Sequence, residues 1–397
     1  MKLFTTALAL ILAISSLSSC AAVPDNMGEK ASKPLEYLQN TYYRLTNDKK
    51  LNIVYVGGSV TDGYGATDQN TKSWRHLTTE WFRGKFPEAR IAETKASIGG
   101  TGSYFADFRY EREIKPHNPD LLFIEFAIND HYGNISYDNV VNTSETLVRK
   151  AYEDNPYIDI IYVLVFDEQV ADSDYPQLKA HRDVADKYGL MSIKMSDHFY
   201  PMLKETNGSY YDYFTDGVHP NDNGYAYFAS VITDRIAQDI IFEDGVISQE
   251  ITQKKAVIPQ NTLSNEPLLL DAKMIYSDEL EMKNVTGWEH QKTNFSWLGT
   301  RYNGRLFASS VGSSFEFDFE GTDLGICYGI GPNRGIITCT VDGENPVVIN
   351  ACTPNTNPCE NSIASGLEKG KHTVKIELTG ASPDGSCNFE IGAFLVN

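Results

Sequence analysis

Ser59 is the residue with the clearest capacity for chemistry, and it follows an apolar segment and two glycines within Leu51–Gly65. Ile53–Val56 has the continuous apolar character of a buried parallel strand, which the two glycines end abruptly. Ligands of open α/β sheets bind beyond the carboxyl ends of the strands, so the pattern predicts that Ser59 is a nucleophile. Serine is also a preferred helix cap, which leaves a purely structural role as the alternative.

A serine nucleophile needs a base, and the segment D-G-V-H-P at 216–220 offers one. Asp216 and His219 stand three residues apart in a loop that contains Gly217 and Pro220. One tight turn can present both side chains, with the carboxylate orienting one ring nitrogen while the other nitrogen faces Ser59. The spacing therefore predicts a Ser–His–Asp group for acyl transfer.

Two further segments supply candidates for an oxyanion hole, which needs donors aimed at developing negative charge. The backbone N–H groups of Ser59 and Gly100 and the side-chain amide of Asn129 would provide three donors. Gly99 is adjacent to Gly100, and the sequence does not decide between the two glycines. A turn glycine and an Asx turn are the structural alternatives at these positions.

The elements that must position these residues alternate between strand-like and helix-like patterns. Strands are predicted at 51–56, 91–98, 120–128, 158–166 and 191–193, and helices at 34–43, 72–85, 103–114, 137–152, 175–188 and 221–241. This alternation predicts a doubly wound parallel sheet, whose right-handed crossovers place the carboxyl ends of the strands at one edge. Ser59, Gly100 and Asn129 all follow such ends.

Four segments together resemble the four sequence blocks of the SGNH (GDSL-like) hydrolase superfamily, over about residues 50–240. They are G-G-S-V-T-D-G (57–63), A-S-I-G-G-T-G (96–102), A-I-N-D (127–130) and D-G-V-H-P (216–220). The resemblance implies a flavodoxin-like three-layer α/β/α fold and ester hydrolysis without a metal or other cofactor. It implies Ser59 as nucleophile, His219 and Asp216 as base and acid, and Ser59, Gly100 and Asn129 as oxyanion donors.

One position departs from the family pattern: the usual aspartate before the serine is Gly58 here. Related secreted carbohydrate esterases tolerate glycine at this position, so we expect activity to survive. Three other polar residues are assigned lesser roles. His131 lines the pocket or is a solvated loop residue, and His181 is a packing or surface residue. Arg109 pairs with a nearby acid, with contact to substrate as the alternative. The sequence shows neither a His/Cys metal-ligand spacing nor a phosphate-binding glycine loop.

Residues 1–20 have the composition of a secretory signal, with Lys2 preceding an apolar stretch too short to span a membrane. The stretch ends at Cys20 in a segment resembling a bacterial lipobox, and an ordinary cleavage site near Ala21-Ala22 is the alternative. We therefore expect a secreted lipoprotein on the bacterial surface or in the periplasm. Residues 21–33 would be a tether, and the lipid on Cys20 the only membrane attachment.

The formal net charge of −19 argues against nucleic acids and anionic membrane surfaces as partners. Neutral or esterified substrates are compatible with it. We predict a hydrolase domain at 34–241, a linker at 242–268 and an all-β sandwich or jelly roll at 269–397. The β-strands of this last domain are predicted at 313–319, 324–329, 336–341, 347–350, 372–378 and 389–396.

The second half also holds five of the six cysteines: Cys327, Cys339, Cys352, Cys359 and Cys387. In a secreted chain they predict disulfides with one odd thiol, and Cys327–Cys339 and Cys352–Cys359 are the short-range pairings. The module resembles the jelly rolls that accompany carbohydrate esterases. Trp288, Trp297 or Tyr302 would bind polysaccharide. Packing of these aromatics in the core or between the domains is one alternative, and an interdomain groove that adds substrate contacts to the Ser59 pocket is another.

These observations predict a serine esterase that removes O-acyl groups, most simply O-acetyl groups, from a polysaccharide or oligosaccharide. A lipase or thioesterase would use the same five residues. A surface glycan-binding lipoprotein without catalytic activity is the alternative outside the enzymes.

Overall fold

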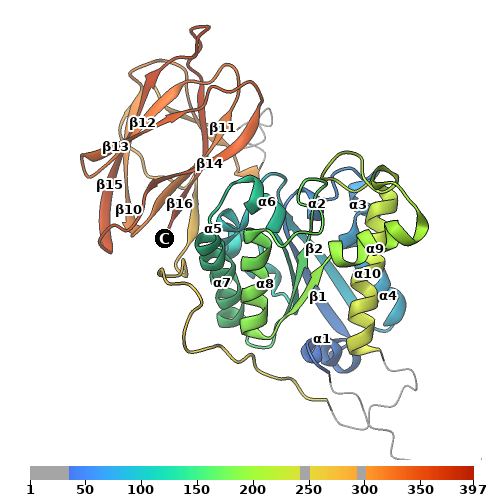
Figure 1. Cartoon of the computed structure of the whole chain (residues 1–397). Coiled ribbons are helices and arrows are strands. Elements are labelled where there is room, and N and C mark those ends of the chain that lie inside the picture. Colours follow the sequence, from blue (N-terminus) through green and yellow to red (C-terminus); the bar gives the residue numbers. More distant parts are fainter. Residues whose placement is uncertain (1–34, 242–250, 293–300) are drawn as a thin grey trace, which may run out of the picture.

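The computed structural model describes residues 35–241, 251–292 and 301–397, which form two domains (Figure 1). The predictions about the signal, Cys20 and Trp297 concern residues outside these ranges. The first domain is built on a five-stranded sheet of order β2-β1-β3-β4-β5, in which every pairing is parallel. Its strands are β1 Lys50–Gly57, β2 Arg90–Ser97, β3 Leu121–Glu125, β4 Asp159–Leu164 and β5 Met191–Lys194. This is the predicted doubly wound arrangement.

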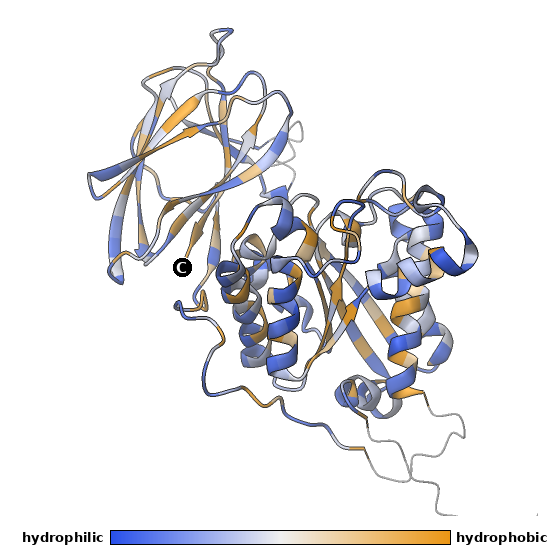
Figure 2. Ribbon diagram, in the orientation of Figure 1, coloured by the Kyte–Doolittle hydropathy of each residue, from blue (hydrophilic) through white to orange (hydrophobic). Residues whose placement is uncertain are grey.

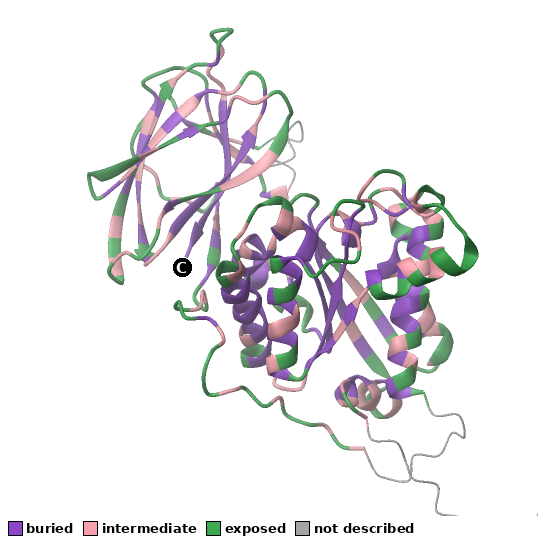
Figure 3. Cartoon of the chain, viewed as in Figure 1, coloured by how far each residue is buried: buried purple, intermediate pink, exposed green. Residues whose placement is uncertain are grey.

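Helices cover both faces of this sheet and make the three layers. The helical segments are α1 Gln39–Tyr43, η1 Arg44–Asp48, α2 Ser59–Asp62, α3 Gln69–Lys72, α4 Trp74–Lys85, α5 Ser103–Glu113, η2 Lys115–His117, α6 Ala127–Tyr132, α7 Tyr137–Asp154, α8 Pro176–Tyr188, α9 Ser196–Thr206, η3 Tyr210–Asp212 and α10 Asp222–Ile240. Helices α5, α7 and α8 lie on one face and α1, α4 and α10 on the other (Figure 1). Every residue of β3 and β4 is buried, as a sheet covered on both faces requires (Figure 3).

Two sequence predictions were wrong in this domain. The strand predicted at 120–128 ends at Glu125, and Ala127 begins α6 instead. Ala127 and Ile128 are buried, and a short buried apolar run has the same composition in a strand and in a helix. No helix was predicted between 188 and 221, but α9 forms there, and its internal Pro201 obscures the helical pattern in the sequence.

The second domain is a sandwich of two antiparallel sheets, as predicted. One has the order β13-β12-β15-β10-β7 and the other β14-β11-β16-β9-β8, with β6 paired to β16. The strands are β6 Lys273–Tyr276, β7 Lys283–Thr286, β8 Glu289–Gln291, β9 Arg305–Ala308, β10 Ser314–Gly321, β11 Leu324–Ile330, β12 Ile336–Val341, β13 Glu344–Asn350, β14 Asn357–Ala364, β15 Gly370–Gly380 and β16 Phe389–Val396. Strand β10 alternates buried Phe315, Phe317 and Phe319 with more exposed polar residues, and the same alternation colours the sandwich strands in Figure 2.

The disulfide prediction was wrong for the described cysteines, since all five are free thiols. Cys327 is on β11 and Cys339 on β12, which belong to opposite sheets. Cys339 points into the sandwich core, whereas Cys327 faces the first domain. The short separation of Cys327 and Cys339 in the sequence therefore did not predict that they are close in the fold.

A strap, residues 251–272, runs from the first domain to β6 without regular secondary structure. The buried Glu145 carboxylate on α7 accepts hydrogen bonds from the backbone N–H groups of Leu263 (2.7 Å) and Ser264 (2.8 Å). The buried ammonium of Lys150 donates to the carbonyl of Ala272 at 2.7 Å. The strap therefore lies against the first domain and fixes where the second domain begins.

The second domain docks on α5 through a shared apolar cluster. Phe105 and Phe108 of α5 pack with Tyr276, Tyr302 and Cys327 of the sandwich. The Arg112 guanidinium lies 4.0 Å from the centre of the Tyr276 ring. This contact orients one sheet of the sandwich toward the carboxyl edge of the parallel sheet. Among the described helices, none is both long and apolar enough to cross a membrane.

Candidate active site

Ser59 stands at the first position of α2, immediately after β1. Gly58 occupies the cap position with extended backbone angles (φ −90°, ψ −150°), so Ser59 itself is not the cap. The Ser59 hydroxyl lies 2.9 Å from His219 Nε2. A hydroxyl at this distance can pass its proton to the ring, which is what activation of a nucleophile needs.

The loop between η3 and α10 holds both His219 and Asp216. His219 Nδ1 is 2.8 Å from Asp216 Oδ2, while Asp216 Oδ1 accepts from the backbone N–H groups of His219 (2.7 Å) and Val218 (2.8 Å). Burial alone would raise the pKa of Asp216, but these hydrogen bonds outweigh it and lower the pKa. The carboxylate is therefore charged at neutral pH and fixes the ring with Nε2 toward Ser59.

Asn129 lies in the first turns of α6, directly against the residue that precedes the serine. A Cβ atom built on Gly58 would collide with Asn129 Oδ1. An aspartate at position 58 would therefore displace the amide. In this chain, Gly58 leaves the space that the Asn129 amide occupies.

The turn after β2 brings Gly99 and Gly100 to the same place. A Cβ atom on Gly99 would be 3.4 Å from Ser59 Cβ, and Gly100 has φ +77°, a conformation that favours glycine. Thr101 closes the turn through its backbone N–H, 3.3 Å from the Ile98 carbonyl. Both glycines line the pocket around Ser59.

This pocket has a volume of about 1040 Å³ and is built by both domains. The first domain contributes Ser59, His219, Asp216, Asn129 and the 99–102 turn. Facing them is the β14 wall, which we define as residues 357–362 of the sandwich, Asn357, Pro358, Cys359, Glu360, Asn361 and Ser362. The five residues predicted from the sequence thus converge at one interdomain pocket. Their catalytic roles remain predictions.

The domain that holds this site is similar to a known protein family. Residues 55–227 match the model of the GDSL-like Lipase/Acylhydrolase family. The chain carries a GDSL-like hydrolase domain. The predicted family and class of enzyme, a hydrolase of carboxylic esters, are confirmed.

Some solved structures are similar to nearly the whole chain, and others to about half of it. A two-domain esterase described as active on acetylated mannans is 22% identical, with a TM-score of 0.78 over 91% of this chain and 96% of its own. This likeness extends the confirmed fold to both domains. A catalytic mutant of an acetylxylan esterase from Geobacillus stearothermophilus is 18% identical, with a TM-score of 0.41 over 49% of this chain and 95% of its own. None of the curated protein sequences matches the chain.

Within the GDSL-like domain, Asp130 and His181 form a buried pair that sequence reasoning missed. His181 Nε2 is 2.8 Å from Asp130 Oδ2, and both side chains are 1% exposed. Asp130 Oδ1 also accepts the Ser103 backbone N–H at 2.9 Å, at the start of α5. Because Asp130 follows Asn129 and Ser103 follows the 99–102 turn, the pair holds the two proposed oxyanion segments together. The sequence signal that points to this pair is Asp130, the last residue of the A-I-N-D segment.

Glu125 is a second buried acid beneath the Ser59 turn. Its Oε2 accepts from the Thr61 hydroxyl (2.8 Å) and the Thr61 backbone N–H (3.2 Å), while Oε1 is buried without a partner. Burial raises the pKa of Glu125 to about 8, against the lowering effect of hydrogen bonds from Thr61 and Gly58. At neutral pH the group is therefore mostly a neutral acid under α2.

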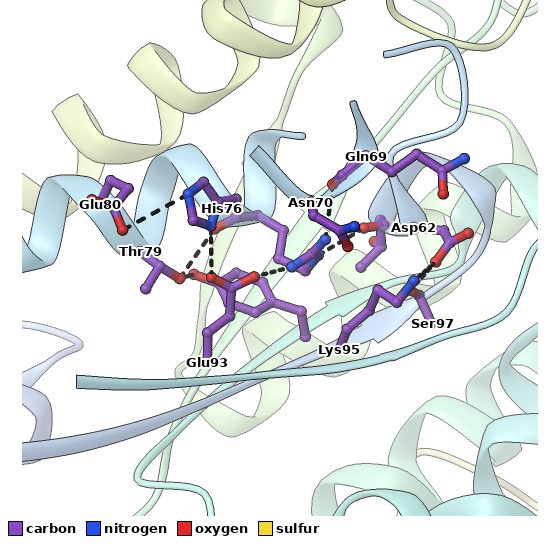
Figure 4. A network of polar contacts seen from close by, with 12 residues as sticks. Asp62, Gln69, Asn70, His76, Thr79, Glu80, Glu93, Lys95 and Ser97 are labelled. Atoms are coloured by element: carbon purple, nitrogen blue, oxygen red, sulfur yellow. Dashed lines mark hydrogen bonds and ion pairs between the residues drawn. The ribbon is translucent and has the colours of Figure 1, made fainter. Parts of the chain in front are cut away.

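A polar network supports the other side of α2 (Figure 4). Asp62 accepts from Lys95 Nζ (2.7 Å) and from the Ser97 hydroxyl (3.2 Å), both on β2. Arg75 on α4 pairs with Glu93 and also donates to the Gln69 carbonyl at 3.0 Å. These contacts fix the end of the helix that Ser59 begins.

The other residues considered from the sequence lie elsewhere. Arg109 is buried and paired with Glu113 at 2.7 Å, as expected. His131 Nδ1 is 3.3 Å from Gln177 Oε1, and His131 is not among the residues lining the pocket. Trp288 packs in the sandwich core and Tyr302 in the interdomain cluster, so the packing alternative holds for both.

Proposed function

We propose that the protein hydrolyses O-acetyl esters on a polysaccharide or oligosaccharide through Ser59, His219 and Asp216. The observation that carries the proposal is the continuous hydrogen-bonded line from the Ser59 hydroxyl through the His219 ring to Asp216, inside the interdomain pocket. In this mechanism Ser59 attacks the ester carbonyl while His219 takes the hydroxyl proton. Asp216 stabilises the charged ring that forms.

The tetrahedral oxyanion would be held by the backbone N–H groups of Ser59 and Gly100 and by the Asn129 amide. His219 then gives its proton to the departing sugar hydroxyl, which leaves acetyl-Ser59. Water, deprotonated by the same His219, hydrolyses this ester and regenerates the serine. Because the pKa of Asp216 is lowered, its carboxylate stays ionised beside the protonated His219 ring throughout the cycle.

A carbohydrate substrate is supported by the composition of the β14 wall. Four polar residues of this wall line the pocket, Asn357, Glu360, Asn361 and Ser362, and amide, carboxylate and hydroxyl groups suit sugar hydroxyls. A lipase or thioesterase would instead need an apolar channel for the acyl chain. The two-domain esterase with the similar fold is described as active on acetylated mannans and was co-crystallised with mannopentaose.

The test is acetate release from acetylated mannan and acetylated xylan, beside a series of p-nitrophenyl esters from C2 to C12. We expect wild-type protein to release acetate and to prefer the C2 ester. Ser59→Ala should lower kcat by about 10⁶-fold because it removes the nucleophile. A preference for long acyl esters would support the lipase alternative. Glycan binding without any ester hydrolysis would support the non-catalytic alternative.

We further propose that the protein is exported and anchored through a lipid on Cys20. The apolar stretch before Cys20 and the polar 21–33 segment support this proposal. Metabolic labelling with a radioactive fatty acid in a bacterial host should label wild-type protein and leave Cys20→Ala unlabelled. Equal labelling of the two proteins would contradict lipidation at this residue.

A further inference from the structure

Two exposed tyrosines line the active-site pocket, and a third lies beside the loop that holds His219. Tyr64, Tyr132 and Tyr211 are 55%, 52% and 54% exposed, and they are the only aromatic side chains in the exposed class among the described residues. Tyr64 follows α2, Tyr132 ends α6 and Tyr211 lies in η3. We call these three residues the tyrosine crescent. Exposed aromatic rings gathered beside a pocket are typical of ligand contacts. The other Phe, Tyr and Trp side chains in the described part of the chain are more deeply buried than these three.

The rings of the crescent are held in place around His219 and Asp216. The Tyr64 ring centre lies 4.6 Å from that of His219, at an interplanar angle of 63°. The Tyr132 hydroxyl donates to the buried Asp167. The Tyr211 hydroxyl donates to Glu168 Oε2 at 2.6 Å, and the Glu168 backbone N–H donates to the Gly217 carbonyl at 2.8 Å. Each ring thus has a contact on one side, while about half of its side chain stays exposed. A ring that is already held in place loses less entropy when a ligand binds.

The charges nearby agree with this placement. Burial and then the bond to Asp167 raise the pKa of Tyr132, and the bond to Glu168 followed by burial raises that of Tyr211. The negative charge of Asp216 contributes to both shifts. The phenols remain neutral, and an anionic ligand would meet Asp167, Glu168 and Asp216. A neutral ligand with an apolar face is favoured.

The crescent and the β14 wall differ in the groups that they offer. Tyr64 and Tyr132 line the same pocket as β14, and Tyr211 lies outside this lining, in η3. A pyranose ring has the matching two-sided chemistry: axial C–H groups form an apolar face that packs on an aromatic ring, and hydroxyls project from its edge. A chain of such rings could rest on the tyrosines while its hydroxyls bond to β14.

We propose that Tyr64, Tyr132 and Tyr211 are stacking subsites for the pyranose rings that flank the acetylated sugar of a neutral polysaccharide. The inference rests on the proposed function for the identity of the reaction. Tyr64 and Tyr132 hold the rings nearest the ester, and Tyr211 holds a more distant one. The crescent therefore selects the backbone of the polymer, whereas Ser59 acts on the ester.

The experiment compares the effects of ring removal on two substrates. In Tyr211→Ala and Tyr132→Ala, we expect kcat/KM for acetylated mannan to fall at least tenfold more than kcat/KM for p-nitrophenyl acetate. Tyr211→Phe keeps the ring and loses only the bond to Glu168, so it should retain at least half of the wild-type activity on the polymer. Tyr157→Ala removes a half-exposed tyrosine just before β4, at the opposite edge of the sheet, and is the matched control. It should change neither value.

Binding of mannopentaose and xylopentaose to Ser59→Ala protein separates this inference from the proposed reaction. Adding Tyr211→Ala to that protein should weaken binding of at least one pentasaccharide about tenfold, as measured by calorimetry. The crescent is not a sugar subsite if Tyr211→Phe loses as much as Tyr211→Ala, or if both substrates are affected equally. Failure of wild-type protein to release acetate from any polysaccharide, with pentasaccharide binding intact, would overturn the proposed reaction and leave the subsites standing.

Discussion

The two walls of the pocket differ in how their polar groups are satisfied. In the GDSL-like wall, Ser59, His219 and Asp216 bond to one another, and Asp216 accepts two further backbone N–H groups. In the β14 wall, Asn361 bonds to Tyr328, whereas the carboxylate of Glu360, which also lines the pocket, bonds among the described contacts only to its own backbone N–H. Groups bonded to each other are preorganised for a reaction, while groups left open can bond to a substrate. If the proposed function is correct, the first wall carries the reaction, and the β14 wall adds contacts to the sugar beside those of the tyrosine crescent.

After the loss of the nucleophile in Ser59→Ala, the largest expected effect is that of Asp216→Asn in the first wall. The variant keeps the shape of the loop but no longer stabilises the ring in its charged form or holds the required tautomer. We expect kcat to fall about 10³–10⁴-fold on both p-nitrophenyl acetate and acetylated mannan. Steady-state kinetics on both substrates is the measurement. A loss confined to the polysaccharide would break the division between the walls.

Asn129→Ala should have the next largest effect. Loss of one oxyanion donor lowers kcat by about 10²–10³-fold. Gly58→Asp should cause a comparable loss, because its side chain would take the space that the Asn129 amide occupies. Near-normal kcat in Gly58→Asp would show that Asn129 is not needed in its observed position.

Glu125→Gln tests the buried acid under Ser59 through the pH dependence of stability. Because the pKa is about 8 in the folded protein and near 4.5 when unfolded, the folded state binds more protons between these values. The wild-type free energy of unfolding should therefore fall as pH rises from 4.5 to 8, by up to about 1.4 kcal/mol per pH unit relative to Glu125→Gln. Urea unfolding at several pH values measures the difference. A difference that is constant with pH would contradict the raised pKa.

His181→Gln tests whether the buried pair positions the oxyanion segments. We expect kcat to fall about tenfold with little change in KM, because Ser103 and Asp130 lose a shared support while the substrate contacts remain. Affinity for a phosphonate mimic of the tetrahedral state should fall in parallel with kcat. A loss of thermal stability with unchanged kcat would assign His181 to folding alone.

The smallest effect is expected in the second wall. Burial raises the pKa of Glu360 to about 7, although the Arg109 charge acts in the lowering direction. The carboxylate accepts hydrogen bonds from sugar hydroxyls better when it is ionised, so KM for acetylated mannan should fall a few-fold as pH rises from 6 to 8. Glu360→Gln should abolish this trend, and p-nitrophenyl acetate should show it far less. Equal trends for both substrates would place Glu360 in the chemistry.

The sequence predicted the parts of the site that rest on local patterns. Ser59 and Asn129 follow buried strands that end in short turns, and periodicity identifies such strands. Its failures concern contacts between distant segments. The partner of Asp130 is 51 residues away on α8, and β14 meets the pocket only because the sandwich docks on α5. The disulfide prediction was wrong for the same reason. Cys327 and Cys339 belong to different sheets, and no local sequence pattern shows which strands share a sheet.

The strap makes the two-domain chain difficult to divide. If the GDSL-like domain were expressed alone to Ile240, the buried Glu145 would lose two of its backbone donors and Lys150 would lose the Ala272 carbonyl. An orphaned buried charge is costly, so excision would destabilise the half that holds Ser59. Chimeras that exchange the sandwich to alter glycan preference should therefore inherit residues 251–272 from the parent of the hydrolase half, with the splice placed just before β6.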